Sequence, residues 1–227
     1  MTANASSWAD ALRALLGLVL PVACVGCGAA DRALCTACRA ALAARPRRVR
    51  LVGGVRLDAA FEYEGLVRTM LLELKLRERV DLARPLGVRF GALVRAALAD
   101  APPGTVVLRV PPSRQGSRRR GFDPVVLLLA RGGVRRPFRP FRPGRLRRVR
   151  RVRRDGGAAA HGQKERTAVE RVAATVGSLV ARGVADRTVV VVDDVVTTGV
   201  TMAEAVRAVR AAGGRVVRCV CVASVED

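Results

Sequence analysis

Residues 189–201 read VVVVDDVVTTGVT, and this stretch decides the fold that we expect. Four consecutive valines, with two more directly after the acids, cannot form an amphipathic helix and predict a parallel strand buried on both faces of a sheet. Helical patterns flank this strand, because apolar residues keep helical spacing from Ala168 to Leu179 before it and over residues 201–214 after it. The order helix, strand, helix predicts an α/β fold with a parallel sheet flanked by helices.

The two acids and the residues after them predict a binding site. In open parallel sheets ligands lie beyond the carboxyl ends of the strands, so we expect Asp193 and Asp194 to project there. The loop that opens the next helix offers backbone N–H groups to an anion, together with the hydroxyls of Thr197, Thr198 and Thr201, and Gly199 allows close approach. Acids beside an anion site favour a ligand with phosphate at one end and hydroxyls, or a metal on hydroxyls, at the other, as in ribose 5-phosphate. The alternative is a solvated pair of acids at a helix start.

A second strand and loop lie upstream. Residues 106–110 are mostly β-branched and are followed by Pro111 and Pro112, so we expect a strand that runs into a basic loop containing glycine. The arginines of this loop, among them Arg114 and Arg120, are candidates for neutralising phosphate groups. An exposed turn in an arginine-rich chain would have a similar composition.

Residues 55–98 predict a strand and two helices. Residues 55–65 alternate partly between apolar and polar, and residues 66–98 have apolar positions at helical spacing, interrupted by Pro85 and Gly87. Lys75 falls on the first helix. A lysine on a helix is usually solvent-exposed, which is the alternative to a role in binding.

Four of the six cysteines form two CxxC pairs near the N-terminus, after a predicted short helix over residues 8–20. Two such pairs with no histidine nearby predict four thiolates around a structural Zn²⁺, held by Cys24, Cys27, Cys35 and Cys38. Such a closed site leaves no open position for catalysis, so its role is to fold a small module. We therefore predict two domains, over residues 1–45 and 46–227. The last two cysteines, Cys219 and Cys221, are predicted to be buried residues on one face of the sheet.

The chain is strongly basic, with 41 Lys and Arg against 19 Asp and Glu and a formal charge of +22. This charge favours polyanionic partners, although a general bias towards Ala, Arg, Val and Gly would also produce it. Residues 131–154 hold twelve arginines and no acid. Phe138 and Phe141 lie among these arginines, a pattern that suits single-stranded DNA, since bases stack on rings while phosphates are neutralised. A solvated basic loop is the alternative.

The N-terminal apolar stretch does not predict a membrane span. Residues 11–23 contain Arg13 and Pro21 and are shorter than the ~20 apolar residues that a bilayer requires. Residues 1–10 carry no Lys or Arg, which argues against a secretory signal. We expect a cytoplasmic protein without a transmembrane helix.

The stretch 189–201 resembles the phosphoribosyl pyrophosphate signature of type I phosphoribosyltransferases. That resemblance implies that Asp193 and Asp194 engage the ribose 2- and 3-hydroxyls, that residues 197–201 hold the 5-phosphate, and that Mg²⁺ accompanies the ligand. It also implies that the loop over Pro111, Pro112, Ser113 and Arg114 holds pyrophosphate. The two acids are thereby the catalytic candidates.

Further motifs narrow the resemblance. A double CxxC, then YEGLVRTMLLELK at 63–75, VPPSRQGSRRRGF at 110–122, a glutamine with ER seven residues on, and the signature follow in that order. This order is similar to the ComF family, which is associated with competence and DNA uptake in bacteria and commonly described as phosphoribosyltransferase-like. The matching positions outside the signature are Lys75, Arg120, Gly121, Phe122, Gln163, Arg171 and Gly177. The chain departs from that pattern at Asp123 and Pro124, at Arg166, Ala174 and Leu179, and in its longer, more basic insert.

Two functions of different classes follow from the resemblance. The first is a phosphoribosyltransferase that exchanges pyrophosphate for a nitrogen nucleophile at the ribose anomeric carbon, with an acceptor that the sequence does not identify. The second is a non-enzymatic adaptor in DNA uptake that keeps the fold as a ligand sensor or scaffold and uses the zinc module and residues 131–154 for single-stranded DNA or a competence helicase. A purely structural zinc-ribbon module is a third interpretation, but it gives the aspartate pair no role.

Overall fold

A computed structural model describes residues 22–30, 32–112, 121–134, 145–148 and 175–225 of the chain. The helices are α2 (Thr36–Ala44), α3 (Gly65–Leu76), the short 3-10 helix η1 (Val80–Leu82), α4 (Ala83–Ala99), α6 (Pro124–Arg131) and α8 (Val200–Ala211). The strands are β1 (Arg48–Val52), β2 (Val55–Glu62), β3 (Val106–Arg109), β4 (Arg145–Arg148), β5 (Leu179–Arg182), β6 (Thr188–Val196) and β7 (Arg215–Ser224). The helix predicted over residues 8–20 lies outside the described residues.

The strands form a five-stranded sheet of order β1-β2-β7-β6-β3 and a small antiparallel pair of β4 and β5. In the larger sheet β2, β7, β6 and β3 run parallel, and β1 adds an antiparallel strand at one edge. The predicted strands over 55–65, 106–110 and 189–196 correspond to β2, β3 and β6. The expectation of a mainly parallel sheet is confirmed.

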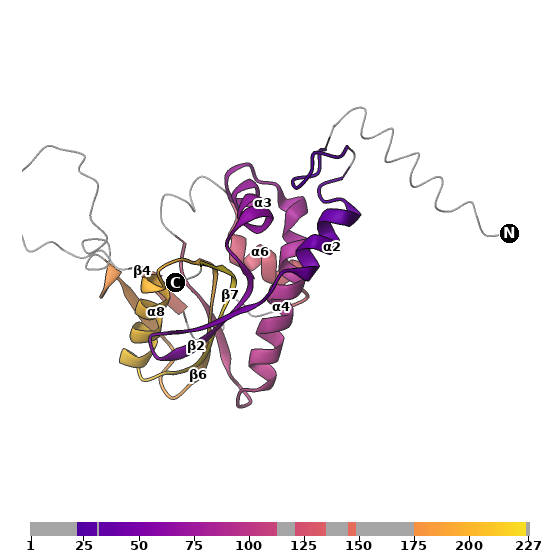
Figure 1. Cartoon of the computed structure of the whole chain (residues 1–227). Helices are drawn as coiled ribbons and strands as arrows, with labels where there is room; N and C mark the ends of the chain where they lie inside the picture. The colour runs from indigo at the N-terminus through magenta and orange to yellow at the C-terminus, as the bar shows by residue number, and fades with distance from the viewer. Residues whose placement is uncertain (1–21, 31, 113–120, 135–144, 149–174, 226–227) are drawn as a thin grey trace, which may run out of the picture.

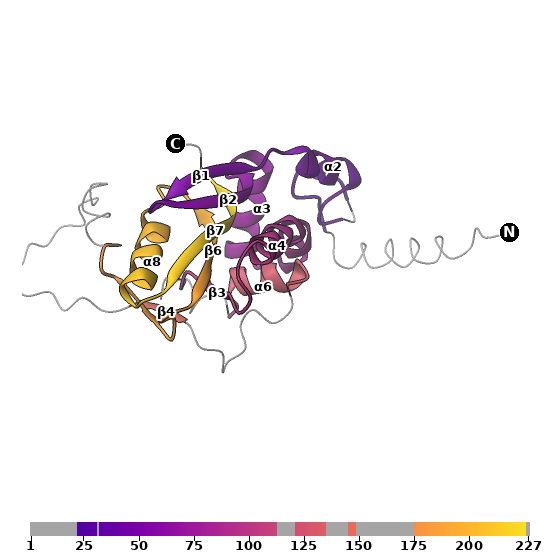
Figure 2. The same cartoon turned by 90° about the horizontal axis from the view of Figure 1, so that it is seen from below.

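Helices cover both faces of the sheet, as Figures 1 and 2 show: α3, α4 and α6 lie on one side and α8 on the other. The valines of β6 divide between these layers because successive side chains of a strand point to opposite faces. Val190 and Val192 belong to the core cluster that includes α3, α4 and α6, whereas Val189 and Val191 belong to the cluster that includes α8 and β5. The continuous apolar run that predicted a strand covered on both faces is thus explained.

Residues 66–98 form two helices, α3 and α4, as predicted. The position predicted for the break between them, at Pro85 and Gly87, is wrong. The helical pattern stops after Leu76, and Pro85 lies in the first turn of α4. A proline is tolerated there because the first N–H groups of a helix have no intrahelical partner. Gly87 lies inside α4, where a larger residue would not fit, because a Cβ there would meet the Leu128 carbonyl oxygen of α6 at 2.4 Å. Close helix contact, not a helix end, requires this glycine.

Leu179 is a second correction. Its helical spacing with earlier apolar residues predicted the last turn of a helix, but Leu179 begins strand β5. Its backbone N–H donates to the buried Glu204 carboxylate of α8 at 3.0 Å. This contact joins the start of β5 to a residue 25 positions later, and local spacing could not predict it.

Asp123, one of the departures from the family pattern, has a structural role. Its side chain accepts a hydrogen bond from the Val126 backbone N–H at 3.2 Å, so it caps α6, and Pro124 follows at the first helical position. Asp123 also pairs with Arg109 at the end of β3 at 2.5 Å. The aspartate and proline therefore fix the start of α6 against β3.

Cys219 and Cys221 both lie in β7 and are fully buried in the core cluster on the α8 side, as predicted. Burial raises the pKa of the Cys219 thiol to about 12 and raises the pKa of the Cys221 thiol well above its usual range. These two thiols are therefore protonated and unreactive in the folded chain. Among the described residues, no helix is long and apolar enough to cross a membrane.

Candidate functional site

A cavity of about 330 Å³ lies at the carboxyl end of β6. Three separate parts of the chain line it: Lys75 of α3, the residues that follow β3, and the stretch from Asp193 to Met202. The predicted site residues that meet there are Lys75, Pro111, Pro112, Asp193, Asp194, Thr197, Thr198, Gly199 and Thr201. This is the position at which open parallel sheets bind ligands.

The two acids reach the cavity because the neighbouring strand ends before them. β3 pairs with β6 only as far as Arg109 opposite Val192, while β6 continues beside β7 to Val196. Asp193 and Asp194 therefore lie within the last residues of the strand, both half-buried. The Asp194 backbone N–H donates to Asp193 Oδ1 at 2.8 Å.

The loop from Thr197 to Gly199 connects β6 to α8. Gly199 has φ = 74°, a left-handed conformation that favours glycine, and α8 begins directly after it. The exposed hydroxyls of this loop thus lie next to the N-terminus of a twelve-residue helix, where N–H groups and the helix dipole favour an anion. The arrangement can hold a phosphate group.

Arg50 of β1 braces this loop from the outside. Its Nη2 donates to the Thr197 carbonyl at 2.6 Å, across 147 positions of sequence. A Cβ on Gly199 would come within 3.4 Å of the Val52 side chain, also from β1. No local signal predicts this contact, since RVRLV at 48–52 indicates only a basic strand.

Lys75 contacts the acids directly. Its Nζ lies 2.8 Å from Asp194 Oδ1, and both side chains are about one-fifth exposed, at 20% and 19%. Among the described residues that line the cavity, Lys75 carries the only positive charge. The alternative of a solvent-exposed lysine does not hold, because this side chain points towards Asp194 at the end of β6.

Other predicted residues lie elsewhere or outside the described residues. Phe122 packs against the core cluster of α3, α4 and α6, and Gly121, with φ = 63°, is exposed just before α6. Neither lines the cavity. The positions outside the described residues are Ser113, Arg114, Arg120, Gln163, Arg171 and most of the arginine-rich segment 131–154.

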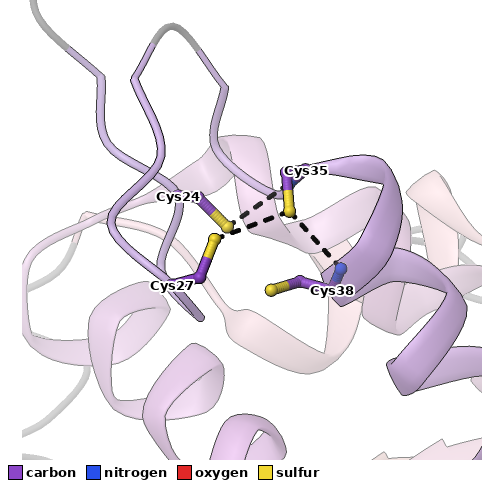
Figure 3. Close-up of side chains that lie close together, drawn as sticks. All are labelled: Cys24, Cys27, Cys35 and Cys38. Atoms are coloured by element: carbon purple, nitrogen blue, oxygen red, sulfur yellow. Dashed lines mark hydrogen bonds between the residues drawn. The ribbon is translucent and has the colours of Figure 1, made fainter.

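The four N-terminal cysteines form a compact cluster, with all four sulfur atoms within 4.8 Å of one another (Figure 3). A tetrahedral site with Zn–S bonds of ~2.3 Å places its sulfur atoms ~3.8 Å apart, and the Sγ atoms of Cys27 and Cys35 are 3.6 Å apart. None of the four is in a disulfide. A Cβ on Gly26 would lie 2.7 Å from Cys38 Sγ, so this glycine lets the first CxxC turn approach the second pair. The cluster can hold a zinc ion.

The titration of these thiols fits a metal site. Burial raises the pKa of Cys24, but backbone N–H groups of Cys35, Cys27 and Gly26 donate to its sulfur and lower its pKa to about 6. The pKa of Cys38 is raised to about 12, mainly by its hydrogen bond to Cys35 and by burial. The Cys24 thiolate is therefore favoured, and the Cys38 thiolate is disfavoured while no cation is bound. A bound Zn²⁺ supplies the charge that four thiolates together require.

Comparison with known proteins finds a match for one part of the chain. Residues 146–227, less than half of it, match the family of the phosphoribosyl transferase domain. The matched range contains β5, β6, α8 and β7, and so it contains both acids and the loop after them. No curated protein matches the chain. With the sheet and the cysteine cluster, the match confirms the predicted fold class, a mostly parallel α/β sheet flanked by helices with an N-terminal four-cysteine cluster.

Proposed function

We propose that this chain binds phosphoribosyl pyrophosphate, or a related ribose phosphate, in the cavity at the end of β6. One observation carries the proposal: two carboxylates, a hydroxyl-rich loop at a helix N-terminus and one lysine line the same cavity. The match of residues 146–227 to the phosphoribosyl transferase domain supports it independently. The cavity volume of about 330 Å³ also suits a small ligand.

The residues that line the cavity include both carboxylates and anion-binding groups, and this difference orients the ligand. The loop 197–201 takes the 5-phosphate, because N–H groups and hydroxyls there donate to phosphate oxygens. Asp193 and Asp194 accept hydrogen bonds from the ribose 2- and 3-hydroxyls. Pro111 and Pro112 begin the loop proposed for pyrophosphate, and Lys75 supplies a positive charge facing the carboxylates. The interaction of Lys75 with Asp194 then offsets part of the repulsion between the acids and a polyphosphate ligand.

The carboxylates also fit Mg²⁺, which prefers oxygen ligands and keeps part of its shell on substrate phosphates. Asp193 and Asp194 would together hold Mg²⁺, directly or through water, and Asp194 also pairs with Lys75. When bound, Mg²⁺ neutralises charge on the pyrophosphate. The chain itself holds the ribose, orients the anomeric carbon and excludes water from one side of it.

The proposed reaction is phosphoribosyl transfer. A nitrogen nucleophile forms a bond to the anomeric carbon as the bond from that carbon to the pyrophosphate oxygen breaks, and pyrophosphate leaves with the electron pair. The ribose carries positive charge in the transition state, and the Asp193 and Asp194 carboxylates stabilise it electrostatically. A chain that binds the ligand without turnover would instead be a sensor or scaffold, the second function that the sequence allows.

Calorimetric titration tests the binding. Phosphoribosyl pyrophosphate with Mg²⁺ is titrated into the native chain and into the double variant Asp193→Asn, Asp194→Asn. We expect binding to the native chain and loss of at least tenfold in affinity in the variant. The matched control is Asp186→Asn, which alters an exposed acid in the turn before β6 and has φ = 57°, a conformation that asparagine tolerates. No binding to the native chain would overturn the proposal.

We further propose that the chain is of the ComF kind, with a zinc-stapled module over residues 1–45 ahead of the phosphoribosyltransferase-like part over 46–227. The four-cysteine cluster and the phosphoribosyl transferase match support this interpretation by their order. Cys24, Leu34 and Leu42 pack in the same core cluster as α3 and α4, so the module rests against the larger part.

A role in competence and DNA uptake, with single-stranded DNA or a helicase as partner, is proposed on this basis, and the net charge of +22 supports binding to DNA. Replacing the four arginines of residues 135–144 by glutamine tests it without altering α6 or β4. On single strands, the log-log slope of affinity against salt should become shallower by about 0.7 for each phosphate that these arginines neutralise. An unchanged slope would reject a DNA role for these arginines.

A further inference from the structure

A second hollow lies between the segment 32–43, which contains the second CxxC pair and most of α2, and helix α4. It has a volume of about 1010 Å³ and is lined by residues of the segment 32–43, by Phe61 of β2 and by residues 81–92. None of these lines the cavity at the end of β6. Figures 1 and 2 both show α2 beside α4, at the end of the molecule away from α8. We call this hollow the α2–α4 groove.

The floor of the groove is apolar and its edge is basic. Leu34, Leu42 and Phe61 are buried beneath it, while Val88 is 53% exposed on α4. Four arginines line it, Arg32, Arg39, Arg84 and Arg89, and among the described residues no carboxylate pairs with them. The single acid of the lining, Asp81, already pairs with Arg79 at 2.8 Å.

Within the described part of the chain, Arg89 has an unpaired donor in the lining of the groove. Its guanidinium lies over the Phe61 ring at 4.9 Å, and its buried Nη1 has no hydrogen-bond partner among the described residues. Burial and the nearby charge of Arg47 both lower the pKa of Arg89. A buried donor without a partner is costly, and that cost is removed when the Arg89 side chain turns its guanidinium towards a carboxylate docked in the groove.

We propose that the α2–α4 groove docks a segment of a partner protein, a helix with apolar side chains along one face and Asp or Glu beside them. An apolar floor with a polar rim is the usual arrangement of a protein interface, and helices commonly bind in grooves of this kind. The four arginines supply the charge complementarity. Nucleic acid fits less well, because stacking of bases requires open rings, and Phe61, the one ring in the lining, is buried and covered by Arg89.

Three synthetic peptides test the proposal by fluorescence anisotropy on the full chain with its zinc content measured. The first is a sixteen-residue helix with leucines at i, i+3, i+4 and i+7 spacing and glutamates beside them; the second has lysine in place of each glutamate; the third is a scrambled form of the first. We expect the first peptide alone to bind. We expect the double variant Arg39→Glu, Arg84→Glu to weaken binding at least tenfold, and Val88→Asp to weaken it as well, since it places a charge on the apolar floor.

The strongly basic chain requires a control of equal charge change. The double variant Arg187→Glu, Arg215→Glu alters two exposed arginines near the start of β6 and β7, outside the groove, and should leave the affinity within twofold. Equal loss in both double variants, or equal binding of the scrambled peptide, would overturn the proposal by showing general charge attraction. Displacement of the peptide by a twelve-residue oligothymidine that loses affinity in the Arg39, Arg84 variant would overturn it in favour of nucleic acid.

Discussion

The pairing of Glu204 with Arg207 on α8 leads to a prediction about stability and its pH dependence. Glu204 is buried, with a side chain 1% exposed, and Arg207 is 46% exposed. Arg207 donates to both carboxylate oxygens, at 2.6 and 2.9 Å, and the Leu179 backbone N–H donates at 3.0 Å. The carboxylate thus joins α8 to β5, and Arg207→Ala would leave a buried charge with only backbone donors.

The magnitude lies between two limits. Breaking a fully buried ion pair costs about 3–5 kcal/mol, and breaking an exposed one costs about 1 kcal/mol or less. Because Arg207 is half-exposed and Glu204 is buried, we expect Arg207→Ala to reduce the free energy of unfolding by about 2 kcal/mol at pH 7, measured by urea unfolding. In a domain of this size that corresponds to a melting temperature lower by roughly 4–8 °C.

The pH dependence has a defined sign. Burial raises the pKa of Glu204, but hydrogen bonds from Arg207 and from the Leu179 and Gly177 backbones outweigh it, and the net pKa is lowered. In the native chain this carboxylate therefore stabilises the fold above the ordinary carboxyl pKa, and the stabilisation is lost as the pH falls through the lowered value. In the Arg207→Ala variant the effect of burial prevails and the pKa of Glu204 rises. Protonation of Glu204 then removes the buried charge and with it part of the destabilisation. The difference between native chain and variant should narrow from pH 7 towards pH 4.

The matched control is Arg77→Ala on α3. Arg77 pairs with Glu73 one turn earlier at 3.0 Å, but its side chain is 74% exposed, so its loss should cost less than about 0.5 kcal/mol. A cost in Arg207→Ala no larger than in this control, or a difference that widens towards acid pH, would refute the reasoning.

Three more predictions concern the binding cavity, the cysteine cluster and the helix contacts. Lys75→Met should weaken phosphoribosyl pyrophosphate binding about tenfold or more in calorimetry, because it removes the charged hydrogen bond from Lys75 to Asp194, and such a bond is worth about 1.5–3 kcal/mol. Unchanged or tighter binding would contradict a role of Lys75 in ligand binding. Cys38→Ser should release zinc, seen with a metal-sensitive dye, and zinc retained at native stoichiometry would contradict a four-thiolate site. Gly91→Ala places a Cβ 2.4 Å from the Gly132 carbonyl oxygen. The overpacking should reduce the free energy of unfolding by about 1–3 kcal/mol and lower the melting temperature by about 3 °C or more. An unchanged melting curve would show that α4 and α6 can separate.

The parts of the fold that the sequence could predict are those that neighbouring residues determine. The run of valines, Gly199 and the apolar spacing after it predict β6, its loop and α8, because burial on both faces and helix geometry act over a few positions. The cysteine cluster is predictable for the same reason, since two CxxC turns fix four thiols within a short segment.

The contacts that complete the site connect residues far apart and have no local signal. Lys75 of α3 pairs with Asp194 of β6, and Arg50 of β1 donates to the Thr197 carbonyl in the loop after β6. A motif shared with a known family indicates Lys75, whereas no motif indicates Arg50. The break misplaced at Pro85 has a different cause, since proline ends a helix in its interior but is accepted in its first turn.

Because Cys219 and Cys221 are buried in β7, their reactivity reports how often the sheet opens. A thiol-alkylating reagent should leave these two residues unmodified while the central strands stay paired, so the rate at which they become labelled measures how often the whole sheet opens. Of the four N-terminal thiols, Cys24 is buried and the other three are partly or fully exposed, so with zinc bound their labelling should follow a separate timescale set by metal loss. Mass spectrometry of one sample would thus measure the rate of metal loss and the rate of global unfolding separately.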